Sequence, residues 1–199
     1  MLNKSWVLGA LAAITIGAGA HASTSVEKVN NDKVKAFDEM LEPGEAERLS
    51  DHLPSVVVYM SSGPGVHEGE TVFAPAGTAP LKNNGTAVLH FVRIYFLTPG
   101  GDETWGTTGL APHYKMLFEN QFARVYDIKI PAQSREPQHS HHDRVVISLS
   151  GAQLEHILPD GTVQPSTLKT GEVVWRKGGT HIGHNMGDTN LWVIAVEPK

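Results

Sequence analysis

The sequence predicts an all-β protein made of two similar β domains in tandem. Twenty Gly and twelve Pro residues divide the chain into short apolar runs, which is typical of barrels and sandwiches. A self-comparison finds a repeat: Val56–Ser61 matches Val145–Ser150, and Gly69–Phe73 matches Gly171–Trp175. Each copy then ends in an apolar run, so both halves are expected to build the same set of strands.

The first 22 residues are expected to be a secretory signal peptide. Lys4 supplies a short positive segment, residues 6–20 form an apolar stretch, and Ala20-His21-Ala22 provides a small-x-small cleavage site. A retained membrane anchor is the alternative, but the apolar run is short for a span and ends in a processing site. We therefore expect a periplasmic or secreted protein that begins at Ser23 and has no membrane contact after cleavage.

The mature chain divides into two copies and a linker. The linker is rich in Gly, Thr and Pro, which favours a loop over a strand. The predicted boundaries are residues 23–98 for the first copy, 99–112 for the linker and 113–199 for the second copy.

Two segments need separate comment. Residues 26–41 have apolar spacing close to that of a helix, but residues 31–38 within them match residues 120–127, which alternate like a strand, so we expect both segments to be extended. The second copy also carries an extra hairpin, Gln153–Leu168, with a turn at Pro159-Asp160-Gly161.

The composition limits the partners and cofactors. The formal net charge is −5 and no basic cluster occurs, so binding to nucleic acid is not expected. The chain has no cysteine, which excludes disulfides, thiolate ligands and a cysteine nucleophile. Any metal must be held by nitrogen and oxygen donors.

Histidines in the second copy form the candidate metal site. His139 and His141 stand two positions apart before an apolar run, and on an extended backbone both imidazoles point to the same face. His181 is the candidate third donor. Three imidazoles are sufficient for a divalent ion and leave positions open for water and a ligand.

The second copy resembles the cupin superfamily in two motifs. The first is a Gly or Pro turn, His-x-His and an apolar strand ending at Gly, and here it runs from Pro131 to Gly151. The second is Gly, a spacer, Pro-x-Gly, His and Asn, and here it runs from Gly171 through His181 to Asn185. Through the repeat the resemblance extends to a bicupin with two double-stranded β-helix (jelly-roll) barrels. It implies that the motif histidines point into a barrel mouth and bind a divalent ion such as Fe, Zn, Mn, Ni or Cu.

The sequence departs from these motifs at two positions. The usual Glu ligand is absent: its place falls on Val145 or Val146 by counting from the histidines, and on Arg144 by aligning the strand. Lys177 stands where the second motif has Pro. The metal site is therefore expected to have three histidine ligands and no carboxylate from the motif.

The first copy is expected to be a degenerate lobe that keeps the barrel and lacks the site. Its residues at the three ligand positions are Ser50, His52 and Ala79. Because the fold repeats without these imidazoles, function is a better explanation than folding for the histidines of the second copy.

His184 and Arg144 are the candidate catalytic residues. His184 is a fourth donor, a proton shuttle or a surface residue. An inward Arg144 would bind a carboxylate that bridges it to the metal, whereas an outward Arg144 would pair with Asp143 or Glu155 at the surface. Strand alternation turns the neighbouring His142 away from the metal.

These observations predict an exported bicupin that binds a divalent ion in its C-terminal barrel. It would bind, and in the catalytic case transform, a small polar or carboxylate-bearing molecule by oxygenase-, isomerase- or lyase-type chemistry. The alternatives are a non-catalytic periplasmic small-molecule or metal-binding protein, and a structural barrel without a site. The first copy could serve as a lid or as the face of a homodimer.

Overall fold

The computed structural model describes residues 22–48, 52–101 and 113–199, and the regular structure in these ranges is entirely β. The predicted all-β class is therefore confirmed. None of these residues lies in a helix long and apolar enough to cross a membrane. The predicted signal peptide lies almost wholly outside the described residues, and so does most of the linker. The strands are β1 (Thr24–Asn30), β2 (Val34–Leu41), β3 (Ser55–Tyr59), β4 (Thr71–Ala74), β5 (Leu89–Phe96), β6 (Tyr114–Glu119), β7 (Ala123–Ile130), β8 (His139–His141), β9 (Arg144–Ser150), β10 (Ala152–Ile157), β11 (Val163–Leu168), β12 (Val173–Arg176), β13 (Gly179–Asn185) and β14 (Leu191–Pro198).

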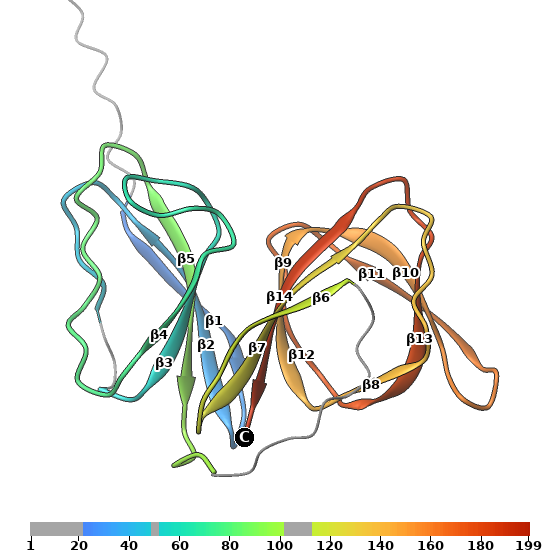
Figure 1. Ribbon diagram of the computed structural model, residues 1–199. Helices are drawn as coiled ribbons and strands as arrows, with labels where there is room; N and C mark the ends of the chain where they lie inside the picture. The colour runs from blue at the N-terminus through green and yellow to red at the C-terminus, as the bar shows by residue number, and fades with distance from the viewer. Residues whose placement is uncertain (1–21, 49–51, 102–112) are drawn as a thin grey trace, which may run out of the picture.

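The strands form three antiparallel sheets (Figure 1). The first sheet comes from the first copy and has the order β1-β2-β5-β3-β4. The second sheet comes from the second copy and has the order β6-β7-β14-β9-β12, so each strand of one sheet has a counterpart at the same place in the other. The third sheet, β11-β10-β13-β8, also comes from the second copy and closes the barrel.

The turns of the two copies correspond in atomic detail. Asn31 and Asn120 each accept hydrogen bonds through Oδ1 from the backbone N–H groups two and three residues later. Asn83 and Asn185 each donate through Nδ2 to a carbonyl at the end of the second strand of their copy and to a carbonyl four residues later. Both also accept from the N–H group two residues later. Asn thus occupies the same turn positions in both copies, because its side chain can hydrogen-bond to backbone groups a few residues away.

The first copy does not show the second half of a barrel. Among its described residues the counterpart of the third sheet is reduced to one bridge, between Ala46 and Lys82, which corresponds to the bridge between Arg135 and His184. Residues 22–48 and 52–98 contain no equivalent of the β10–β11 hairpin. Short segments without neighbouring strands cannot satisfy the hydrogen bonds of a sheet. The expectation of two complete barrels is therefore not confirmed, whereas the predicted hairpin at Gln153–Leu168 is confirmed.

The second sheet is buried on both faces, and this orients the site. Along β9, Val145 and Ile147 pack toward the first sheet, and Val146 packs into the barrel. A strand buried on both sides reads as a continuous apolar run, as this one does. Because side chains alternate, Arg144 faces the barrel with Val146. The cluster between the sheets comprises Val29, Val34, Ala36, Val56, Val58, Val92, Ile94, Phe96, Ala123, Val125, Val145, Ile147, Leu149, Val173, Ile194 and Val196.

Candidate metal centre

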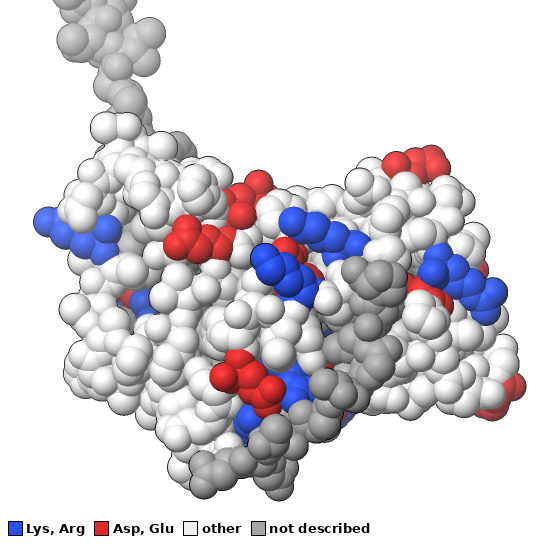
Figure 2. Space-filling view, in the orientation of Figure 1, with Lys and Arg blue, Asp and Glu red and all other residues white. Residues whose placement is uncertain are grey.

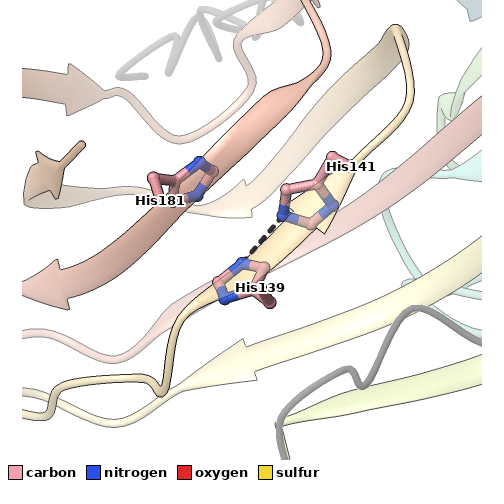
Figure 3. Close-up of side chains that lie close together, drawn as sticks. All are labelled: His139, His141 and His181. Carbon is pink, nitrogen blue, oxygen red and sulfur yellow. Dashed lines mark hydrogen bonds between the residues drawn. The ribbon is translucent and has the colours of Figure 1, made fainter. Parts of the chain in front are cut away.

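The short strand β8 presents His139 and His141 on one face, and β13 lies beside it. In the antiparallel register His181 is the partner of His139, and Gly179 is the partner of His141. His139 is 4% exposed and His141 is 8% exposed, so both residues are buried. Figure 3 shows the three rings directed toward one another from the two strands.

The donor atoms of the three imidazoles converge. The Nε2 atoms of His139 and His141 are 2.9 Å apart. One nitrogen from each of the three rings lies within 4.8 Å of the other two. The structure thus brings together the three histidines that the sequence predicts as ligands.

The orientation of His139 leaves a lone pair at the centre of this cluster. Its Nδ1 is 2.9 Å from the carbonyl oxygen of Pro137 and donates a hydrogen bond to it, so Nε2 of the neutral ring carries no proton. Burial lowers the pKa of His139, which keeps the ring neutral at pH 7. A neutral imidazole held by a carbonyl through its other nitrogen is the usual form of a metal ligand.

The other two rings are also held neutral. Burial, followed by the Arg144 charge, lowers the pKa of His141 far below its ordinary range. Burial, followed by the His156 ring, lowers the pKa of His181 to about 3. The Nδ1 atom of His141 lies 3.7 Å from a carboxylate oxygen of Glu197.

Arg144 points into the barrel. It is 9% exposed and lines the cavity beside the histidines, and its Nη1 donates a hydrogen bond to the His142 carbonyl at 3.3 Å. The surface pairing considered above does not form with Asp143, which instead binds Lys177 Nζ at 2.9 Å. A fixed positive charge therefore stands beside the candidate metal centre.

Glu136 is a site residue that the sequence analysis missed. It is 4% exposed, its Oε2 is 4.0 Å from His139 Nε2, and its Oε1 has no hydrogen-bond partner among the described residues. Gly183 makes room for it, because a Cβ there would lie 2.3 Å from Oε2. Burial raises the pKa of Glu136 to about 7. Its position three residues before His139 was the available signal.

Tyr114 is a second residue that the sequence analysis missed. Its hydroxyl oxygen is 3.1 Å from His139 Nε2 and 3.2 Å from His141 Nε2. Tyr114 belongs to β6, at the edge of the opposite sheet, and lies 25 positions before His139. No local pattern in the sequence links the two.

The donor set is compatible with a divalent ion. Three neutral imidazoles converge, and the buried Glu136 carboxylate beside them has an oxygen without a hydrogen-bond partner in the described part of the chain. The sequence contains no cysteine, so no thiolate is available. Nitrogen with oxygen donors suits Fe, Zn, Mn, Ni and Cu.

His141 and His181 line a cavity of about 390 Å³, which is the size of a small-molecule site. Arg176 lines this cavity and is the cross-strand partner of Arg144, so both guanidinium groups belong to the same side of the barrel. Among the described residues neither of them forms an ion pair with a carboxylate. His156 also lines the cavity, and its ring centroid is 4.7 Å from that of His181.

The remaining predicted residues lie farther from the centre. His184 lines the cavity at its rim, where its Nδ1 is 3.8 Å from Glu155 Oε2 and its side chain is 26% exposed. His142 follows β8 and does not line the cavity. In the first copy His52 and Ala79 are exposed, and Ser50 lies outside the described residues.

The positive groups of the cavity contrast with the outer surface. On the face drawn in Figure 2, outside the grey atoms, Lys and Arg side chains are interspersed with Asp and Glu side chains. The unbalanced charge is therefore a feature of the cavity and not of this face.

Comparison with solved structures shows the fold. AerE from Microcystis aeruginosa matches with a TM-score of 0.58 and 11% identity, over 89% of this chain and 98% of its own. A cupin 2 conserved barrel domain protein from Leptotrichia buccalis matches with a TM-score of 0.53 and 12% identity, over 92% of each chain. Oxalate decarboxylase from Bacillus subtilis, which has Mn(II) centres, matches with a TM-score of 0.54 and 13% identity, over 91% of this chain and 78% of its own.

These matches establish a cupin fold for the chain. No protein-family model matches the sequence, and a comparison with curated proteins finds no match. At such low identities the activities of the three proteins do not carry over to this chain.

Proposed function

We propose that this chain is an exported cupin protein that holds a divalent ion through His139, His141 and His181 and binds a small carboxylate-bearing molecule beside it. The observation that carries the proposal is the convergence of three neutral imidazoles on one point, two of them buried and the third half-buried. A bound divalent ion would polarise a carboxylate or carbonyl oxygen, or activate a water or oxygen molecule. In this proposal the chain is a bicupin whose first copy is a degenerate lobe.

The charge of the cavity supports an anionic ligand. Arg144 and Arg176 both line it without an ion pair to a described carboxylate. The two buried acids close to the centre, Glu136 and Glu197, do not balance them fully, because burial raises the pKa of each to about 7. A guanidinium group binds a carboxylate with two parallel hydrogen bonds. We assign this role to Arg144, because it is the guanidinium group beside the histidines.

Within the same proposal His184 carries protons. Its ring lies at the rim of the cavity, partly exposed and close to Glu155. Its side chain can therefore exchange protons between a bound molecule and solvent while β13 stays in place. Export is proposed from the signal-peptide pattern of the first 22 residues.

Metal analysis of protein purified without a histidine tag tests the proposal. We expect about one divalent ion per chain, and loss of the ion in His139→Ala and His181→Ala with the fold retained. His52→Ala is the matched control, because His52 is the exposed counterpart of His141 in the first copy and should keep the ion. A wild-type protein that is free of metal, and whose stability does not change with added metal or chelator, would exclude the metal site.

Ligand binding and turnover are then measured on the loaded protein with a panel of small mono- and dicarboxylates. Binding that Arg144→Gln weakens supports the carboxylate site. Turnover or oxygen consumption identifies an enzyme, and saturable binding without turnover identifies a non-catalytic binding protein.

A further inference from the structure

The Tyr114 hydroxyl and two histidine nitrogens form a compact triangle. The three edges are 2.9 Å between the Nε2 atoms of His139 and His141, 3.1 Å from Tyr114 to His139 and 3.2 Å from Tyr114 to His141. Ligands bound about 2.1 Å from one ion and at right angles to each other are about 3.0 Å apart. The triangle therefore has the dimensions of three neighbouring ligands of one ion.

Hydrogen bonds alone do not account for this triangle. His139 Nε2 has no proton to donate, because Nδ1 of the same ring donates to the Pro137 carbonyl. The hydroxyl of Tyr114 has one proton, and Nε2 of His141 has at most one. The three contacts form a closed ring of three atoms, and these two protons can satisfy only two of them. A cation bound by one lone pair from each of the three atoms would account for all three short distances without a third proton.

The fold holds the phenol in this position. Tyr114 begins β6 and is the cross-strand partner of Ile128, and its ring packs edge-on against Tyr126 with centroids 6.2 Å apart. The side chain thus extends from the second sheet across the barrel to the histidines of the third sheet. It supplies an oxygen donor to a cluster that has no carboxylate from the first motif.

We propose that the Tyr114 oxygen is the fourth protein ligand of the metal centre, in place of the Glu that the first motif lacks. The inference rests on the proposed metal-binding function. The positive ion favours loss of the hydroxyl proton, as it does for other coordinating groups. The hydroxyl proton is released to solvent when the ion binds, as for other ligand groups that must lose a proton.

Titration of metal-free protein with Cu(II), followed by visible absorption, tests the inference. A tyrosine oxygen bound to Cu(II) produces a phenolate-to-metal charge-transfer band in the visible region, which imidazole ligands do not produce. We expect this band in the wild type with one equivalent of Cu(II), and its loss in Tyr114→Phe, which keeps the ring and removes only the oxygen. Tyr114→Phe should also weaken Zn(II) binding at least about tenfold.

Controls use the other tyrosines of the chain. The four tyrosines are Tyr59, Tyr95, Tyr114 and Tyr126. Tyr126→Phe, which lies beside Tyr114 in the barrel, should keep the band. If Tyr114→Phe does not fold, a variant with the other three tyrosines changed to Phe assigns the band by keeping it.

The possible results are distinguishable from one another. Wild-type protein that binds neither Cu(II) nor Zn(II) overturns both this inference and the proposed function. Metal binding without the band overturns the inference alone, even where Tyr114→Phe weakens Zn(II) binding, because Tyr114 would then act as a hydrogen-bond partner of the histidines. A band that survives Tyr114→Phe also overturns it.

Discussion

Two adjacent glycines, Gly178 and Gly179, have different roles beside the metal centre. A Cβ on Gly178 would lie 2.6 Å from the carbonyl oxygen of His141, and one on Gly179 would meet nothing within 4 Å. The backbone N–H of Gly178 also donates to Asp143 at 2.7 Å, which fixes the bend after β8. Gly178 therefore allows β8 to approach the turn before β13.

We expect Gly178→Ala to destabilise the metal-free protein by about 1–3 kcal/mol, because the new Cβ meets backbone that cannot move aside easily. It should also weaken Zn(II) binding, since it displaces the strand that carries His141. Gly179→Ala is the matched control and should change stability by less than about 0.5 kcal/mol. Urea unfolding and Zn(II) titration measure both effects, and equal results for the two variants would contradict this account.

At the scale of single residues, the convergence of the three histidines could be predicted from the sequence. His139 and His141 follow from the two-residue period of a strand, and His181 follows from combining the two motifs. The direction of Arg144 remained open, because the alignment depended on the segment chosen. Tyr114 and Glu136 were missed because one comes from the opposite sheet and the other precedes a turn whose direction no periodicity determines.

Strand β8 is the weakest element of the site. It has three residues and is the edge strand of its sheet, held by β13 alone. An edge strand of this length has few hydrogen bonds to break before it opens. The proposed ion would connect β8 to β13 through His139, His141 and His181.

Hydrogen exchange should show this connection. We expect added Zn(II) to slow amide exchange in β8 and β13, because an ion that binds only the closed form stabilises it by about 2.7 kcal/mol at a hundred times its Kd. The amides of β1 and β2, which belong to the first sheet, serve as the internal control. Unchanged protection of β8, or an equal change in β1, would exclude a local effect of the ion.

At the scale of elements, the strands and the extra hairpin could be predicted because each has a turn signal and a matching segment. The reduced first copy could not be predicted with the same rules. Its segments still match the second copy, as the bridge between Ala46 and Lys82 shows. A segment forms a strand only where a neighbouring strand is available to pair with it. In the second copy that neighbour is the β10–β11 hairpin, so the sequence of the segment alone does not decide the outcome.

At the scale of the whole molecule, the two copies share one core. Gly69 of the first copy shows how closely they pack: its φ is +78°, and a Cβ there would lie 2.4 Å from the indole ring of Trp192. Gly77 has the same φ of +78° with nothing within 4 Å. Ala substitutions at Gly69 and Gly77 therefore separate two contributions to stability: the free-energy cost of the left-handed backbone, and the cost of disturbing the contact between copies.

We expect Gly77→Ala to cost about 1–2 kcal/mol, the price of a left-handed conformation. Gly69→Ala should cost a further 1–3 kcal/mol or so, because the Trp192 ring must also move. Equilibrium urea unfolding of metal-free protein measures both variants, and a single transition is expected because the core is shared. Equal losses in the two variants would show that the copies do not pack tightly at this point.

The sheet shared between the copies also bears on how such a chain evolves. Val145, Ile147 and Ile194 belong to the copy with the candidate site, yet they are covered by residues of the first copy. A gene that lost the first copy would leave this apolar face bare and prone to aggregation. Selection would therefore retain a copy that has no binding site, because that copy keeps the apolar face of the other one covered.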